Sequence, residues 1–217
     1  MKKTHVLFDF DGTLVDSAPA ILTTFAQVLQ AHGLQACCSI DDSLIGPPLR
    51  QTLQTLCGSS DVQLLDTLAS SFRDIYDGPA CLATPAYPGW DDALAALRAL
   101  GLQLLIATNK RLLPTQRIIQ ARGWSEYFKV VYASDSCPGG FPNKAAMIAA
   151  LLEEHGIDAQ GAIYLGDTEA DASAATANAV EFWAVDWGYG EFAGQYPTFD
   201  RPAAVVSCLS QMSLLVP

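Results

Sequence analysis

The chain has 217 residues, half of them apolar, and 23 acidic against 12 basic residues give it a formal net charge of −11. This length suits one sizeable domain, or a core domain with a smaller insertion. So few basic residues argue against a nucleic acid or an anionic membrane as the partner, and no apolar run reaches the roughly 20 residues of a membrane span. A strand pattern follows the first three residues where a signal peptide would have an apolar core, so we expect a cytoplasmic protein.

The first expected element is an apolar strand that leads into two aspartates. Residues 6–8 have the character of a buried parallel strand, and Gly12 ends it. Asp9 and Asp11 stand two positions apart, so on an extended backbone both side chains leave by the same face. They also lie at the C-terminal end of the strand, where open α/β sheets bind ligands. Paired carboxylates there suit Mg²⁺, although Asp-Gly is also an ordinary turn signal.

Residues 17–82 have helical periodicity and no strand pattern. Apolar residues at three- and four-residue steps predict a first helix that ends at Gly33, with His32 on its apolar face. A second helix is expected to end at Gly58, and a third to begin near Asp61. The whole stretch is therefore expected to be a helical block.

From residue 83 onward, strand and helix patterns alternate. Strands are expected at residues 102–107, 130–133, 162–165 and 180–185, and helices at 89–100, 112–122, 144–155 and 169–178. A short strand near residues 204–206 and a weak helix follow. This order predicts an α/β fold with a doubly wound, mostly parallel sheet, a Rossmann-like core.

The helical block interrupts this alternation directly after the first strand. We therefore expect a core domain of residues 1–16 and 83–217 and a small inserted α-helical cap domain of residues 17–82. An insertion at that point lies over the C-terminal edge of the sheet, where it can cover a ligand site as a lid.

Polar side chains follow four of the expected strands. They are Asp9 and Asp11, then Thr108 and Asn109, then Lys144, and finally Asp167 and Asp171. Each has an ordinary alternative, because Thr, Asn and Asp often cap helices and a single lysine is often a solvated surface residue. The C-terminal ends of parallel strands lie along one edge, so these groups can meet around one small site.

The six cysteines form no CxxC pair, and no histidine lies at a metal-ligand spacing from them. We therefore expect free thiols in a reducing compartment, and neither a zinc site nor a disulfide framework.

Four sequence motifs together resemble those of the haloacid dehalogenase-like superfamily, in the same order, over about residues 4–185. They are Asp9-Phe10-Asp11-Gly12-Thr13-Leu14, Thr108-Asn109, Lys144 and Gly166-Asp167-Thr168-x-x-Asp171. The helical insertion is similar to the cap of the phosphoglycolate phosphatase-like branch, and residues 44–50 look like its cap loop. The resemblance implies a Mg²⁺-dependent phosphatase acting on a small phosphorylated metabolite, such as a phosphoglycolate-, nucleotide- or sugar-phosphate-like ester. A monomer and a homodimer both remain open.

The resemblance also implies roles for the acidic residues. Asp9 would be the nucleophile that accepts the phosphoryl group, and Asp11 the general acid for the leaving oxygen and then the base for water. Mg²⁺ would be held by Asp9, Asp167 and the backbone carbonyl of Asp11, with Asp171 close by. A carboxylate nucleophile divides the displacement into two steps.

The remaining expected site residues bind substrate. By resemblance, Thr108, Lys144 and the backbone of Asn109 hold the phosphate. Arg50, beside a stiff Gly-Pro-Pro turn, is expected to contact the rest of the substrate, the alternative being a surface arginine.

Two other functions stay open. A sugar phosphomutase of the β-phosphoglucomutase type would use the same residues and return the phosphoryl group to the substrate. A binding protein on an inactive phosphatase fold would not need both Asp9 and Asp11, so the intact motif counts against it.

Overall fold

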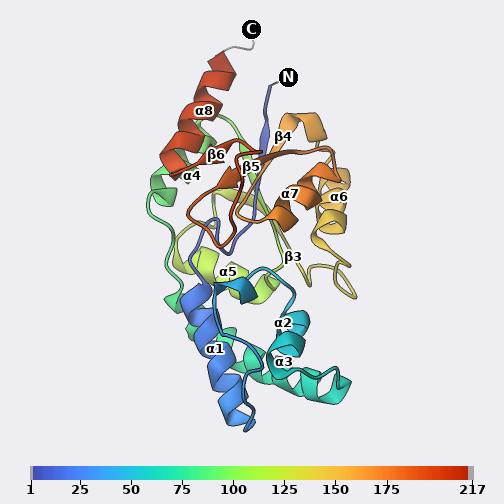
Figure 1. Ribbon diagram of the computed structural model, residues 1–217. Helices are drawn as coiled ribbons and strands as arrows, with labels where there is room; N and C mark the ends of the chain where they lie inside the picture. Colours follow the sequence, from blue (N-terminus) through green and yellow to red (C-terminus); the bar gives the residue numbers. More distant parts are fainter. Residues whose placement is uncertain (1, 215–217) are drawn as a thin grey trace.

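The computed structural model describes residues 2–214 (Figure 1). Within that range six strands form one sheet in the order β3-β2-β1-β4-β5-β6, and every neighbouring pair is parallel. This confirms the predicted doubly wound, Rossmann-like core. The strands are β1 (His5–Phe8), β2 (Gln103–Thr108), β3 (Phe128–Ala133), β4 (Ala162–Gly166), β5 (Glu181–Val185) and β6 (Thr198–Phe199).

Helices cover both faces of the sheet. On one face pack α4 (Trp90–Ala99), α5 (Leu112–Ala121) and α8 (Pro202–Leu214), and on the other α6 (Lys144–Glu154) and α7 (Glu169–Thr176). Figure 1 shows α4 and α8 on one side of the strands and α6 and α7 on the other. β1, β2 and β4 are buried on both faces, which explains the continuous apolar runs at residues 6–8, 104–107 and 162–165 within them.

The strand order reverses at β1, which lies between β2 and β4. Phe8 pairs in register with Ile106 of β2 and Leu165 of β4, so the three strands end at nearly the same level. In a sheet of this order the ligand crevice lies outside the carboxyl ends of the strands at the reversal. The residues that follow β1, β2 and β4 are therefore placed next to one another.

The segment between β1 and α4 contains helices only. These are α1 (Ala18–Ala31), α2 (Leu49–Cys57) and α3 (Val62–Tyr76), with short 3₁₀ turns at Asp42–Leu44 and Ala80–Ala83. In Figure 1 they form a group at the end of the molecule remote from both termini. The rings of Phe25 and Phe72 pack with their centroids 4.7 Å apart and join α1 to α3. We call these helices the cap; its domain limits at residues 17 and 82 stay a prediction.

Two local predictions are wrong. Residues 204–206 belong to α8 and not to a strand, and the sixth strand is the earlier pair Thr198–Phe199. Val205 and Leu209, four positions apart, are buried on one face of α8, and Pro202 at its start is a common first residue of a helix. His32 does not lie on the apolar face of α1: it is exposed and bonds to the Ser71 hydroxyl at 2.8 Å.

All six cysteines are free thiols. From residue 2 to residue 214 no helix combines the length and the apolar character that crossing a membrane requires.

The start of α3 is held by the side chain of an aspartate. The Asp61 side chain accepts hydrogen bonds from the backbone N–H groups of Gln63 at 2.8 Å and Leu64 at 3.3 Å. Asp61→Ala should lower the free energy of unfolding by about 1 kcal/mol, because both donors lose their cap. Asp61→Asn keeps an acceptor oxygen and should unfold close to the parent in urea. Equal loss in both variants would contradict the cap assignment.

Candidate active site

Three buried carboxylates meet at the carboxyl edge of the sheet. Asp9 follows β1, Asp167 follows β4, and Asp171 lies in the first turn of α7. One oxygen from each lies within 4.8 Å of the others. All three side chains are almost fully shielded from solvent. The strand ends thus bring together three of the acidic residues predicted from the sequence.

Lys144 is the cation of this cluster. It is the first residue of α6, whose N-terminus is fixed by the Asn143 side chain accepting from Ala146 N–H at 2.8 Å. Its Nζ lies 3.0 Å from Asp9 Oδ2 and also donates to Asp171 Oδ1. Burial disfavours the charge, but the Asp171 and Asp9 carboxylates outweigh it and raise the pKa of Lys144 well above its ordinary value.

The oxygens of Asp167 and Asp171 have partners in the protein. Asp167 accepts from the Thr13 hydroxyl at 3.1 Å and from Tyr189 N–H at 2.9 Å. Asp171 Oδ2 accepts from the Thr168 N–H at 3.1 Å and the Thr168 hydroxyl at 2.6 Å, which closes a capping box at the start of α7. Asp9 differs: its Oδ1 is buried and finds no hydrogen-bond partner among the described residues.

The donor set fits a divalent cation. Three carboxylates face one lysine, so the cluster is short of positive charge. Burial, followed by the neighbouring carboxylates, raises the pKa of Asp167 from 3.8 to about 8, and burial also raises that of Asp9 to about 7. The unpartnered Oδ1 of Asp9 and the neighbouring carboxylate of Asp167 are oxygen ligands of the type that Mg²⁺ binds.

Glycines give Asp167 the room it needs. A Cβ on Gly12, whose φ is +80°, would lie 2.1 Å from Asp167 Oδ2, and one on Gly188 would lie 2.2 Å from Asp167 Cβ. Gly12 follows Asp11 in the turn after β1, so the Asp-Gly signal marks both a turn and a close approach of two loops.

The side chain of Asp11 pairs with a different lysine. Lys110 Nζ donates to Asp11 Oδ1 at 2.9 Å and to the Tyr76 hydroxyl at 2.6 Å. Burial opposes the charge, but Asp11 and Tyr76 outweigh it and raise the pKa of Lys110 above its ordinary value. Asp11 comes from the end of β1, Lys110 from the end of β2 and Tyr76 from α3, so this triad connects the core to the cap.

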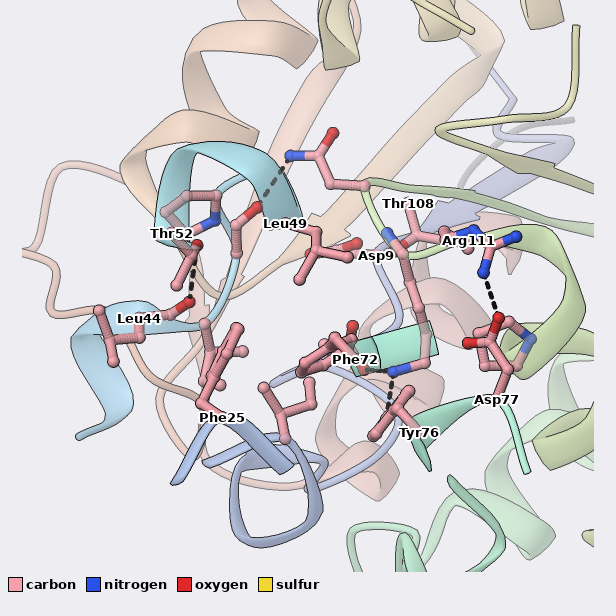
Figure 2. A pocket seen from close by; sticks show the side chains of 18 residues that line it. Asp9, Phe25, Leu44, Leu49, Thr52, Phe72, Tyr76, Asp77, Thr108 and Arg111 are labelled. Carbon is pink, nitrogen blue, oxygen red and sulfur yellow. Dashed lines mark hydrogen bonds and ion pairs between the residues drawn. The ribbon is translucent and has the colours of Figure 1, made fainter. Parts of the chain in front are cut away.

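The loop after β2 makes two further contacts with the cap. The Asn109 side chain donates to the carbonyl of Gly46 at 3.0 Å, and Arg111 pairs with Asp77, the residue that ends α3. Figure 2 shows the Arg111–Asp77 pair at one end of the pocket between cap and core. The side-chain amide of Asn109 thus points toward the cap.

Thr108 is oriented toward the same pocket. Its buried side chain lines the cavity next to Asp9, and its Oγ1 accepts a hydrogen bond from Lys110 N–H at 3.2 Å. The hydroxyl proton is therefore available to a ligand oxygen. Neither Thr108 nor Asn109 caps α5, because Arg111 occupies that position.

Arg50 is not brought to this site. Its guanidinium pairs with Asp66 and donates to the Val62 carbonyl at 3.4 Å, joining α2 to the start of α3 on an exposed surface. It is not among the residues that line the pocket. Arg50 therefore has no part in the function proposed below.

No role was predicted for Lys110, Arg111, Tyr76 or Tyr189. Tyr189 donates its backbone N–H to Asp167, and its hydroxyl accepts from the N–H groups of Ser17 and Ala18 at 2.9 and 3.0 Å. Lys110 and Arg111 directly follow Thr108-Asn109, and this position at the end of a strand could have indicated that they lie near the site. The tyrosines lie in a helix and a loop with no motif, so only the fold identifies them.

The chain is similar to known hydrolases in sequence and in structure. Residues 6–185 match the family described as haloacid dehalogenase-like hydrolase. A phosphoglycolate phosphatase from Rhodobacter capsulatus is 34% identical over 193 residues, 85% of this chain and 84% of that protein. A solved haloacid dehalogenase-like family hydrolase from Streptococcus pneumoniae is 28% identical, with a TM-score of 0.84 over 95% of this chain and 98% of that one.

A relative with a different name also matches. The tyrosine-protein kinase PtkA of Mycobacterium tuberculosis is 29% identical over 187 residues, which are 85% of this chain but only 62% of the length of that protein. In the solved structure of PtkA the identity is 26% and the TM-score 0.79, over 96% of this chain and 98% of that one.

The carboxylate cluster predicts a pH-dependent response to metal. Asp9 and Asp167 hold protons in the folded state that the unfolded chain releases above about pH 4. Their stabilising contribution is complete below pH 4 and is lost as the pH rises through about 7 to 8. In chelator, stability should therefore fall over this window, whereas Mg²⁺ should raise the thermal midpoint more at pH 8 than at pH 5, because fewer protons compete with it.

Asp167→Asn is the control, because it replaces one titrating carboxylate with an uncharged amide of nearly the same size. Its stability in chelator should depend less on pH, and Mg²⁺ should shift its midpoint little. A parent protein whose midpoint rises equally with Mg²⁺ at both pH values would contradict a metal site at these carboxylates.

Proposed function

The chain belongs to the haloacid dehalogenase-like hydrolase family, and on that premise we propose that it is a Mg²⁺-dependent phosphatase that hydrolyses a small phosphomonoester through an aspartyl-phosphate on Asp9. The observation that carries this proposal is the environment of Asp9. Its buried Oδ1 has no partner within residues 2–214, while Lys144 and Asp167 lie beside it and Thr108 lines the same pocket.

Asp9 is the nucleophile. Its carboxylate attacks phosphorus, the bond from phosphorus to the ester oxygen breaks, and the phosphoryl group is transferred to Asp9. The Thr108 hydroxyl and the Asn109 backbone N–H hold the non-bridging oxygens, and the ammonium of Lys144 offsets the charge on the transferred group. Mg²⁺, held by Asp9, Asp167 and the Asp11 carbonyl, would neutralise the remaining negative charge when bound. Asp171, engaged by Lys144 and Thr168, keeps that lysine in place.

Asp11 is the general acid and base. It gives a proton to the departing ester oxygen and then takes one from the water that attacks the aspartyl-phosphate, which releases inorganic phosphate and restores Asp9. Lys110 holds Oδ1 of Asp11 at 2.9 Å, which leaves Oδ2 to carry the proton. Tyr76 positions Lys110 from the cap, so the acid–base group is held in place when cap and core are in contact.

The two opening aspartates should give different phenotypes. Asp9→Asn should abolish turnover of every ester, because an amide does not accept the phosphoryl group. Asp11→Asn should lose roughly 10²–10⁴-fold on alkyl phosphates, whose basic leaving groups need a proton. With p-nitrophenyl phosphate, whose leaving group is a weak base, it should give a burst of nitrophenol and then slow turnover. Mass spectrometry should find the phosphate on Asp9.

Parent-rate turnover of alkyl phosphates by Asp11→Asn would overturn its acid–base role. The same assays separate other functions of the family. A phosphomutase would convert a sugar phosphate into its isomer in the presence of a sugar bisphosphate. A tyrosine kinase, which is what the name of PtkA describes, would transfer phosphate from ATP to tyrosine. Release of inorganic phosphate from an ester without either product supports the phosphatase.

Tyr76→Phe tests the connection between cap and acid–base group. The change removes only the hydroxyl that accepts from Lys110, so kcat for alkyl phosphates should fall about tenfold, the value of a hydrogen bond to a charged group. The rate of nitrophenol release from p-nitrophenyl phosphate in a single turnover should stay at the parent value, because that step needs no proton. Tyr132→Phe, which removes a hydroxyl bonded to Glu154 away from the pocket, is the matched control and should keep parent kinetics. An equal loss on both classes of ester would assign Tyr76 a structural role only.

A further inference from the structure

The pocket above Asp9 has two unlike walls. A cavity of about 90 Å³ separates the strand ends from the cap. Its core side carries Asp9, Asp11 and Thr108. Most of its cap side is hydrocarbon from Ile21, Phe25, Leu44, Ile45, Leu49 and Phe72, and its polar side chains are those of Thr52, Tyr76 and Asp77. In Figure 2 the labelled cap residues Phe25, Leu44, Leu49 and Phe72 lie on one side, with Asp9, Thr108 and Arg111 on the other.

The cations that line this pocket already have carboxylate partners. Lys110 is paired with Asp11. Arg111 is paired with Asp77 and, at 3.2 Å, with Asp135. Within the part of the chain that the structure describes, both cations of the pocket lining are therefore paired, and Lys144, outside the lining, is itself paired with Asp9 and Asp171.

The cap loop does not supply the missing charge. Arg50 follows Leu49 in sequence, but Leu49 faces the pocket while Arg50 pairs with Asp66 outside it. A substrate carboxylate directed at the cap would therefore lose water against Leu49 and Phe72 without gaining a cation as partner, and the Asp77 carboxylate also lines the pocket. An apolar group in the same place would be removed from water at no such cost.

We propose that the part of the substrate beyond the phosphoryl group is small, apolar and uncharged, an alkyl or aryl alcohol esterified to phosphate, and not a carboxylate such as glycolate. This inference rests on the proposed function for the position of the phosphoryl group. Phe25, Phe72 and Tyr76 form a row of packed rings, with centroids 4.7 and 5.4 Å apart, along which the apolar group lies. The ester is cleaved as above, and the alcohol leaves with the proton from Asp11.

The test compares isobutyl phosphate with 2-phosphoglycolate, which match in size but differ in charge. Binding is measured by calorimetry on Asp9→Asn with Mg²⁺, where the esters stay intact, and kcat/KM on the parent. Isobutyl phosphate should bind at least about tenfold more tightly, the effect of one unpaired charge against an apolar wall. Glycolate is the less basic leaving group, so chemistry alone favours it and a preference for isobutyl phosphate in kcat/KM reflects the wall.

Equal or tighter binding of 2-phosphoglycolate would overturn the inference and leave the phosphatase proposal standing. If the parent hydrolyses no ester but Asp9→Asn still prefers isobutyl phosphate, the apolar pocket is supported and the phosphatase proposal fails. The binding measurement thus decides the inference independently of turnover.

Two variants of the wall test the cause. Leu49→Arg places a cation at a partly exposed position of the pocket and should shift the ratio of affinities toward 2-phosphoglycolate by about tenfold. Leu49→Met should leave that ratio unchanged. Ile21→Arg, from α1, repeats the test on a second helix. Arg50→Ala, outside the pocket, should not change the ratio. A selective loss of 2-phosphoglycolate binding in that variant would contradict the conclusion that Arg50 supplies no charge to the pocket.

Discussion

Three carboxylates buried around a single ammonium place the strictest demand on this fold, because charges removed from water must be compensated by other charges or by hydrogen bonds. Asp167 and Asp171 are compensated by Thr13, Tyr189 and Thr168. Those partners come from the turn after β1, the loop after β5 and the start of α7. The local structure at the carboxyl edge is thus arranged to hold negative charge, and the oxygen left bare belongs to the residue proposed to react.

The parallel sheet makes this arrangement possible with short connections. β1 lies between β2 and β4, so three chain segments that are distant in sequence end side by side. The end of β2 follows the end of β1 by about a hundred residues, and the end of β4 follows that of β2 by about sixty. Thr108 ends β2 and Gly166 ends β4, and each is followed within a few residues by groups of the site. The glycines at 12 and 188 then let the loops approach Asp167 more closely than any side chain would allow.

The sequence predicted the core well where one local rule decided the outcome. Runs rich in apolar residues predicted the strands from β1 to β5. The polar residues that follow β1, β2 and β4 lie together at the carboxyl edge of the sheet, as their positions after the strands implied. Prediction failed at α8, since a short run with Val205 and Val206 suits a strand and a buried helix equally, and packing against α4 decides between them. The prediction for His32 also failed, because α1 ends at Ala31 and His32, the residue after it, is exposed to solvent.

Arg50 and Lys110 mark the limit of residue-by-residue reading. Both are cations next to a motif, but Leu49 and Arg50 are neighbours on a helix and point in different directions, and only one faces the pocket. Lys110 follows Thr108-Asn109 at the end of a strand, where the side chain can reach Asp11 on one side and Tyr76 on the other. The loop after β2 therefore has two kinds of contact within four residues: Thr108 lines the pocket with Asp9, while Asn109, Lys110 and Arg111 each bond to the cap. A shift of the cap relative to the core would break these three contacts together, so the position of the cap and the orientation of Asp11 are physically coupled through Lys110.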